Sequence, residues 1–202
     1  TGRDFDCLTA LRAYHTEGDL MNVGRSNDEL WVSFLTRRDH ASGVARLALC
    51  RNDITWVGQA RAVTVFDSGG MWALELMGDT NIQVTTSVPS TVGQTFLMVL
   101  RIRFAGLLAS NIVDLFINPT ELGDAPLAVP TATLMTTSNL FKFARIHWYP
   151  GSQPNYASLD EFRLGLSYAA VTPVWPTSTV PVVATASLPV AQIGEYYSGL
   201  LR

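Results

Sequence analysis

The feature that most constrains the fold of this chain is a strict alternation of apolar and polar residues. In residues 95–104 every second side chain is large and apolar, and the residues between them include Arg101 and Arg103. Successive side chains of a β-strand point to opposite faces of a sheet, so this segment is predicted to be a strand with one buried face. Five side chains should therefore lie in the core: Phe96, Met98, Leu100, Ile102 and Phe104.

The same alternation recurs along the chain, and turn-forming residues separate the repeats. It is found in residues 30–36, 71–77, 82–88, 113–117 and 160–166. Gly and Pro residues lie between these segments and space the predicted strands by roughly 8–12 residues. Helical periodicity is absent apart from a short stretch at residues 6–14. This organisation predicts an all-β fold, an antiparallel sandwich or barrel, and not alternating strands and helices.

Length and charge restrict the class of protein further. A chain of 202 residues fits one domain with at most an extension, and it needs no metal or disulfide lattice to fold. The net charge is −3, and the basic residues, of which only Lys142 is a lysine, form no run, so no nucleic-acid partner is predicted. No run of about 18 apolar residues exists, so no membrane span is predicted.

Four segments, in order, carry a family resemblance: Leu30-Trp-Val-Ser-Phe-Leu35, Leu97-Met-Val-Leu-Arg-Ile-Arg-Phe104, Val113-Asp-Leu-Phe-Ile-Asn-Pro119 and Ala157-Ser-Leu-Asp-Glu-Phe-Arg-Leu-Gly165. The last runs on to Ala170-Val-Thr-Pro173 and is the most specific. Together they resemble the laminin-G-like, concanavalin A-like jelly roll of secreted bacterial surface proteins. The resemblance implies two curved antiparallel sheets and a secreted or cell-surface location. It implies no single activity, because this fold carries lectins, adhesion modules, enzymes and structural domains.

The resemblance ends near Pro173, and the composition of the chain changes there. Residues 173–181 are rich in Pro, Thr and Ser, and the residues that follow are apolar. We therefore predict a sandwich domain of residues 1–173 and an extended tail of residues 174–202. The Thr- and Ser-rich part offers candidate sites for O-linked sugar. They are Thr177, Ser178, Thr179 and Thr185.

The tail is predicted to mediate self-assembly. An apolar extension outside a finished domain favours association, and an added strand satisfies the backbone groups of an open sheet edge. We expect the tail to pack on a sheet edge of a neighbouring subunit, giving a homo-oligomer or polymer. Packing on its own subunit is the alternative. The residues predicted to make the contact are Val180, Val182, Val183, Leu188, Val190, Ile193, Tyr196 and Tyr197.

Acidic residues do not form the pattern that a glycanase needs. Glycanases that share this type of sandwich carry acids in an E-x-D-x-E spacing on one strand. The nearest match is Glu75-Leu-Met-Gly-Asp79, which lacks the central acid. Asp160 and Glu161 are adjacent, so they would face opposite sides of a strand. We therefore predict that the protein is not an enzyme.

Asp160 has a structural interpretation instead. It shares the parity of Phe162, Leu164 and Leu166, which predicts an inward position. A buried carboxylate needs hydrogen-bond partners, and we expect backbone N–H groups of a neighbouring turn to supply them rather than a metal ion.

Aromatic residues give the best candidate for a ligand site, because exposed rings stack on flat sugar faces. The densest group surrounds the Pro150-Gly151 turn and consists of Trp148, Tyr149, Asn155 and Tyr156. A sugar-binding platform there is one prediction. The other, which we favour, is that the rings fill the sandwich core or pack under the tail.

The two cysteines and the loop acids leave alternatives open. Cys7 and Cys50 would form a disulfide in an exported protein, and otherwise both are small buried apolar residues. No cofactor is predicted, except that ligand-binding members of the resembled family use calcium. The acids outside the predicted strands form no clustered calcium pattern, so its ligands are unassigned. They are Asp4, Asp6, Asp19, Asp28, Asp53, Asp67, Asp79 and Asp124.

Two classes of function therefore remain, and neither is catalytic. The first is an extracellular structural or adhesive module that self-assembles through its tail. The second is a lectin-like module that binds a glycan, with or without calcium. Native size and glycan binding of the secreted protein would separate them.

Overall fold

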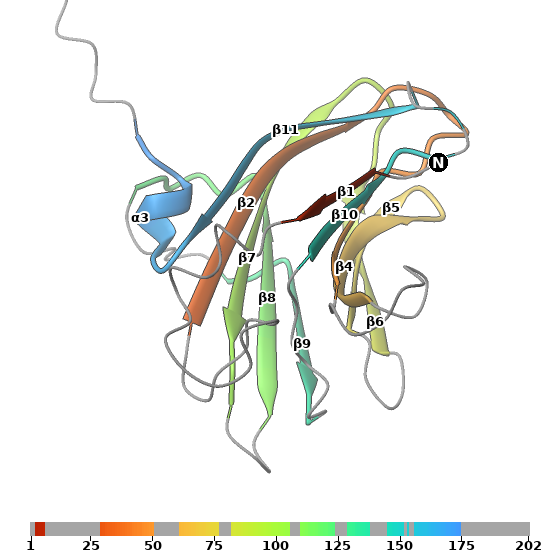
Figure 1. Ribbon diagram of the computed structural model, residues 1–202. Coiled ribbons are helices and arrows are strands. Elements are labelled where there is room, and N and C mark those ends of the chain that lie inside the picture. The colour runs from red at the N-terminus through yellow and green to blue at the C-terminus, as the bar shows by residue number, and fades with distance from the viewer. Residues whose placement is uncertain are drawn as a thin grey trace, which may run out of the picture.

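A computed structural model describes residues 3–6, 29–50, 61–76, 82–105, 110–123, 129–137, 145–151, 153 and 156–174. In this part of the chain eleven strands form two antiparallel sheets that pack face to face, and one short helix lies outside them (Figure 1). The predicted all-β, two-sheet sandwich is therefore confirmed.

Each sheet combines strands that are distant in the sequence. The six-stranded sheet has the order β1 (Arg3–Asp6), β10 (Arg145–Tyr149), β3 (Arg46–Cys50), β4 (Arg61–Ser68), β5 (Met71–Leu76) and β6 (Ile82–Pro89). The five-stranded sheet has the order β11 (Ala157–Gly165), β2 (Glu29–Arg38), β7 (Thr95–Arg103), β8 (Asn111–Ile117) and β9 (Ala132–Thr136). The edge strands β6 and β9 approach each other on one side of the sandwich. The edges on the other side are β1 and β11.

The core lies between the two sheets and consists of the residues that the alternation places inward. All five side chains predicted from residues 95–104 are at most 3% exposed: Phe96, Met98, Leu100, Ile102 and Phe104. Trp72 of the facing sheet packs edge-on against Phe96, with ring centroids 5.4 Å apart. The prediction for this strand is therefore confirmed.

A buried arginine joins the two sheets at one end of the sandwich. Arg38, the last residue of β2, is 8% exposed and donates to the carbonyl oxygens of Gly43 and Ser90 at 3.1 and 2.9 Å. The same guanidinium lies 3.2 Å from the carboxylate of Asp67 on β4, which also accepts from the Ser90 hydroxyl. A buried charge is tolerated only when it is paired and hydrogen-bonded in this way. Asp67 is therefore committed to a structural role.

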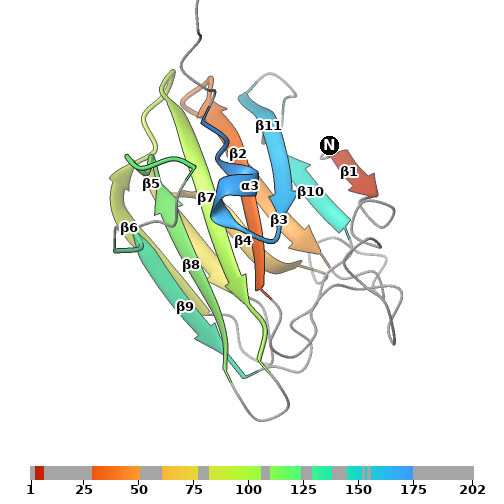
Figure 2. The same ribbon diagram turned by 90° about the vertical axis from the view of Figure 1, so that its left-hand side faces the viewer.

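The short helix α3 (Tyr168–Val171) lies on the outer face of the five-stranded sheet (Figure 2). It covers a second apolar cluster on that face, formed by Trp31, Val99 and Phe116. The Ser33 hydroxyl donates to the Val171 carbonyl oxygen at 2.6 Å. Four residues are too few to produce helical periodicity, so the sequence did not predict this helix. Within the described residues, no helix has the length and apolar character needed to cross a membrane.

A bulge in β11 corrects one prediction. The pairing of β11 with β2 shifts between Asp160 and Arg163, and Glu161 has a positive φ of 51°. The extra residue changes the facing, so that Leu159 and Phe162 both pack on the core although three positions separate them. Asp160 therefore lies on the outer face and is exposed, and its predicted inward position is wrong.

Candidate functional site

The predicted sugar platform does not form one surface. Trp148 belongs to the core and is 8% exposed, so its ring offers no face to a ligand and that part of the prediction is wrong. Tyr149 lies half-buried on the outer face of the six-stranded sheet. Tyr156 stacks on His40 beyond the end of β2, with ring centroids 4.5 Å apart. Asn155 lies outside the described residues.

The candidate catalytic acids lie on opposite sides of the molecule. Glu75 is on the outer face of the six-stranded sheet, because Leu74 and Leu76 on either side of it point into the core. Asp160 is on the outer face of the five-stranded sheet and accepts from the Glu161 N–H at 2.8 Å. The whole core separates these carboxylates. Asp79 lies outside the described residues.

Other predicted residues also fall outside the described part of the chain. These include Cys7, all the tail residues and the four candidate O-glycosylation sites, so the structure does not test those predictions. Cys50 is described and is 3% exposed. Among the described residues, no three His, Cys, Asp or Glu side chains gather closely enough to hold a metal ion. Calcium binding stays a prediction.

The outer face of the five-stranded sheet satisfies most of its polar groups internally. Arg101 pairs with Glu29 at 2.7 Å, and its guanidinium also lies over the Trp31 ring at 5.5 Å. Arg103 pairs with Asp114 at 2.8 Å. Because α3 covers the apolar centre and ion pairs occupy one end, this part of the face offers a ligand few unpaired groups.

The outer face of the six-stranded sheet has a different composition. Cross-strand pairing places two rows of outward side chains across five strands. One row runs from β10 to β6 as His147, Ala48, Thr64, Glu75 and Gln83. The second row, two residues further along each strand, is Tyr149, Arg46, Phe66, Ala73 and Thr85. We call these ten residues the Glu75 face. In Figure 1 the β4–β5 hairpin bends at its upper end toward this outer side.

The centre of the Glu75 face holds two polar groups without partners. The Thr64 side chain is fully buried, and its hydroxyl oxygen has no hydrogen bond. Glu75 is its cross-strand neighbour and is half-buried, and no described residue donates to its carboxylate. Buried polar groups are normally hydrogen-bonded, so each exception requires an explanation. Thr36 and Trp72 also carry an unpartnered buried atom, but both face the core. The Arg103 Nε on the outer face of the five-stranded sheet is a further buried atom without a hydrogen bond.

Small and aromatic residues surround these two groups. Ala48 and Ala73, which flank Thr64 and Phe66 in their rows, have no exposed surface. Arg46 lies over the Phe66 ring at 5.1 Å, which fixes the ring in the plane of this face. At the end of the first row, Gln83 is exposed and donates to Thr85 at 3.4 Å. The face therefore combines an apolar centre with an imidazole, a phenol, a carboxylate and an amide.

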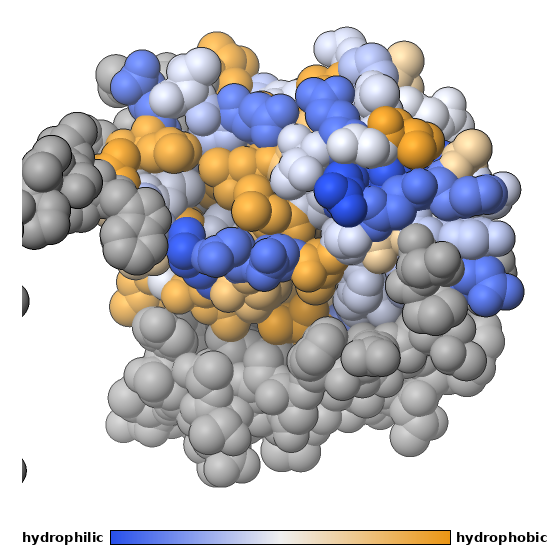
Figure 3. All heavy atoms as spheres, turned by 90° about the horizontal axis from the view of Figure 1, so that it is seen from above, coloured by the Kyte–Doolittle hydropathy of each residue, from blue (hydrophilic) through white to orange (hydrophobic). Residues whose placement is uncertain are grey.

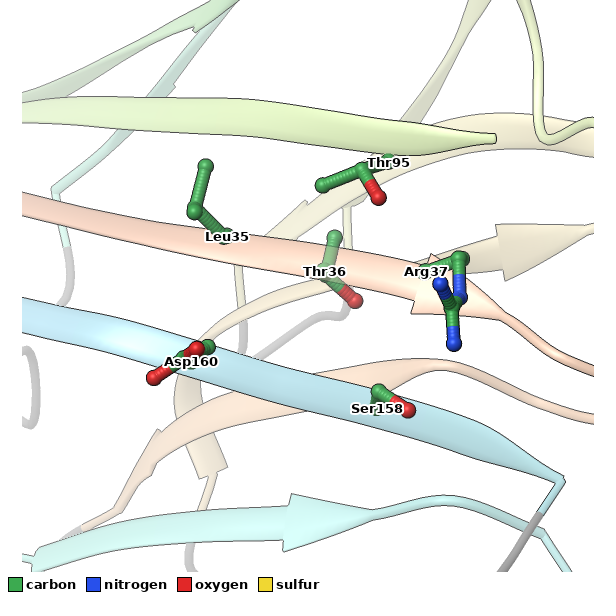
Figure 4. Close-up of a pocket in the computed structure, with 6 residues that line it drawn as sticks. All are labelled: Leu35, Thr36, Arg37, Thr95, Ser158 and Asp160. Carbon is green, nitrogen blue, oxygen red and sulfur yellow. The ribbon is translucent and has the colours of Figure 1, made fainter. Parts of the chain in front are cut away.

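A separate pocket lies on the outer face of the five-stranded sheet, at the end that α3 leaves uncovered (Figure 4). We call it the β11 pocket, and its volume is about 290 Å³. The residues that line it come from β2, β7 and β11: Leu35, Thr36, Arg37, Thr95, Ser158 and Asp160. Sequence reasoning missed it because the bulge that turns Asp160 outward leaves no signal in the alternation.

Apolar side chains are exposed around α3 and the end of the described chain. Leu166 and Val174 are each 60% exposed, and Leu122 is 37% exposed. Val174 packs against Gly123, where an added Cβ would come within 2.7 Å of the valine side chain. Seen from above, hydrophobic atoms are concentrated on the left, the side of α3, and a band of hydrophilic atoms crosses them (Figure 3). The tail thus starts from an apolar region.

No protein-family model and no curated protein matches the chain. Several solved structures have a similar arrangement. One is an endo-β-1,4-glucuronan lyase from the fungus Trichoderma reesei, with a TM-score of 0.47, 12% identity and 75% of each chain covered. Sheep galectin-11 in complex with glycerol has a TM-score of 0.45 and 10% identity, and the match covers 71% of this chain and 94% of that one.

An alginate lyase from Pseudomonas aeruginosa is a third similar structure, with a TM-score of 0.42 and 9% identity over 70% of this chain and 68% of that one. At these identities and with TM-scores below 0.5, the likenesses carry no argument about activity or ligand. The coarse fold, a β-sandwich of two antiparallel sheets, rests on the strand pairing itself. The finer resemblance to laminin-G-like domains stays a prediction.

Proposed function

We propose that the protein is a non-catalytic glycan-binding module and that its ligand site is the Glu75 face. The observation that carries the proposal is the buried Thr64 hydroxyl, which has no hydrogen bond, beside the half-buried Glu75 carboxylate, to which no described residue donates. An unsatisfied buried polar group costs roughly 1–3 kcal/mol. A ligand that supplies the missing hydrogen bonds recovers this free energy on binding.

The chemistry of the pair suits a ligand rich in hydroxyl groups. A carboxylate only accepts hydrogen bonds, whereas the Thr64 hydroxyl donates and accepts. A sugar hydroxyl also does both, so adjacent sugar hydroxyls can donate to Glu75 and bond to Thr64. The half-buried Tyr149 ring suits the C–H face of a sugar. Thr64 itself is fully buried, so a ligand reaches its hydroxyl only when the atoms that cover it move aside.

Binding is proposed rather than hydrolysis because a glycosidase uses two carboxyl groups, roughly 5–9.5 Å apart. Glu75 is the only carboxylate on the Glu75 face among the residues whose side chains are described. The face therefore has an acceptor for sugar hydroxyls without the second acid of a hydrolytic pair.

A glycan array tests this proposal. The full-length protein is expected to bind one class of neutral or acidic glycan, and Glu75→Gln should lower the affinity at least tenfold, because charged hydrogen bonds contribute roughly 1.5–3 kcal/mol. Glu161→Gln is the matched control, since it removes a carboxylate from the other side of the sandwich. Absence of binding across the array, or equal binding by Glu75→Gln, would overturn the proposal.

Self-assembly through the tail is a second proposed function, and it is compatible with the first. The exposed apolar residues Leu122, Leu166 and Val174 support it, because the tail begins among them. They lie on the side of the five-stranded sheet, so an assembly built there leaves the Glu75 face open to a ligand. A chain that ends at Pro173 should be a folded monomer, whereas the full chain should form larger species in sedimentation. Identical sedimentation of the two would contradict self-assembly.

A further inference from the structure

We infer that the β11 pocket is a second ligand site, separate from the Glu75 face, and that it takes a monosaccharide-sized ligand with a positively charged amine. Its volume of about 290 Å³ lies at the small end of the range for small-molecule sites, roughly 300–1,000 Å³. The pocket is therefore large enough for one sugar unit and too small for a long glycan segment.

One wall of the pocket is held in place by its own hydrogen bonds. The Arg37 guanidinium pairs with Asp39, and the Ser158 hydroxyl donates to the other oxygen of the same carboxylate. Arg37 is thus neutralised by Asp39, and the Ser158 oxygen keeps its ability to accept. This wall offers hydroxyl groups a fixed surface without a net charge.

Further along β11, Asp160 carries a carboxylate that has no cation beside it. Asp160 is exposed and accepts only from the N–H of Glu161, its own neighbour in the chain. The nearby carboxylate of Glu161 is already paired with Arg163. Among the residues that line the pocket, Asp160 is therefore the one charge without an opposite partner. An ammonium group on the ligand would pair with the Asp160 carboxylate through a charge-assisted hydrogen bond.

The backbone is shaped in a way that presents Asp160 to the pocket. Glu161 adopts a left-handed φ of 51°, which is unfavourable for a residue other than glycine. The bulge that this residue forms places Asp160 opposite Leu35 and Ser158 opposite Arg37, all on the outer face. Figure 4 shows Ser158 and Asp160 along β11 with Leu35 and Arg37 on the neighbouring strand. Leu35, which pairs with Asp160 across β2 and β11, adds an apolar side chain beside this carboxylate.

Binding of simple sugars to the full-length protein tests this site. Glucosamine should bind at millimolar concentration in an NMR titration, with shifts at the amides of Leu35, Ser158 and Glu161. N-acetylglucosamine and glucose, which lack the positive charge, should bind about tenfold more weakly or not at all, because a hydrogen bond to a charged group contributes roughly 1.5–3 kcal/mol. Asp160→Asn should reduce the affinity for glucosamine by about the same factor.

A control variant makes the result specific. Glu75→Gln removes a carboxylate from the other face and should leave glucosamine binding unchanged. Equal binding of the three sugars, unchanged binding by Asp160→Asn, or no saturable binding would each overturn the inference. Loss of glycan-array binding in Glu75→Gln with glucosamine binding intact would establish that the two sites are independent.

Discussion

The two outer faces of this sandwich are built from the same kind of strand, but they differ in how their polar groups are satisfied. On the part of the five-stranded sheet around α3, Arg101 and Arg103 form ion pairs with Glu29 and Asp114, and α3 covers the apolar centre. On the six-stranded sheet, the Thr64 hydroxyl has no hydrogen bond, and no described residue donates to the neighbouring Glu75 carboxylate. The region around α3 uses its charged side chains for stability, whereas the centre of the Glu75 face leaves polar groups for a ligand to complete.

The two faces also differ in where the chain leaves the domain. The described chain ends at Val174, beside α3 and on the side of the five-stranded sheet (Figure 1). The described chain therefore ends away from the Glu75 face.

The largest expected effect on stability comes from a substitution in the core, which supports both faces. Leu100→Ala deletes a side chain that is 1% exposed in the core between the sheets. The free energy of unfolding should fall by about 2–5 kcal/mol, because a cavity replaces the lost methyl groups. Urea denaturation measures this, with Leu122→Ala at an exposed position as control. A loss below about 1 kcal/mol would contradict the position of Leu100 in the core.

A smaller effect is expected on the covered face. Ser33→Ala removes the hydroxyl that donates to the Val171 carbonyl oxygen under α3. The buried carbonyl then loses its donor, so the free energy of unfolding should fall by about 1–3 kcal/mol. Glycan binding at the Glu75 face should be unchanged. Impaired binding in a folded Ser33→Ala protein would contradict the separation of the two faces.

Removal of a hydroxyl from the Glu75 face should have the opposite effect on the free energy of unfolding. Thr64→Val replaces a buried hydroxyl that has no partner by a methyl group of similar size. The free energy of unfolding should rise by about 1 kcal/mol, because the desolvation cost disappears. Glycan affinity should fall in the same variant. If Thr64→Val is destabilised, the hydroxyl is satisfied in the free protein and the comparison between the faces fails.

The smallest effect depends on pH and concerns α3. Burial raises the pKa of Tyr168 above its ordinary value near 10, and Glu121 adds to the increase while a hydrogen bond with Thr172 opposes it. The native state therefore holds this proton more tightly than the unfolded state. The resulting stability is complete below pH 10 and is lost as the pH rises through the raised pKa.

Tyr168→Phe should remove this dependence on pH. The variant loses the hydrogen bond from the phenol to the Glu121 carbonyl oxygen, which contributes about 0.5–1.5 kcal/mol. The wild-type protein should therefore be more stable than the variant at pH 8, and the difference should shrink near pH 11. Chemical denaturation at both pH values measures it. A difference that does not change with pH would show that Tyr168 is not buried as a neutral phenol.

Regular strands could be predicted from the sequence, and irregular ones could not. The alternation in β7 gave the correct facing because nothing interrupts the strand between Thr95 and Arg103. The same reasoning failed in β11, because one extra residue at Glu161 reverses the facing of Asp160. Parity is thus reliable only when the register continues without a shift.

The candidate site was harder to predict than the fold. Glu75 was recognised as an acid on a strand, but its proximity to Thr64 depends on how β4 pairs with β5. His147 and Gln83 share that row although 64 positions separate them in the sequence. For Trp148 two positions stayed open, a sugar platform and the core, because the five-residue strand β10 is too short to fix its facing from alternation alone.

The most direct test of the Glu75 face is an NMR footprint of the glycan that the array selects. Chemical shifts of the labelled full-length protein would be compared with and without that glycan. Perturbations are predicted at Thr64, Glu75 and His147, with Trp31 and Ser33 beneath α3 unaffected. Perturbations confined to β2, β7 and β8, with Thr64 and Glu75 unchanged, would place the glycan on the five-stranded sheet and contradict the assignment of the binding site.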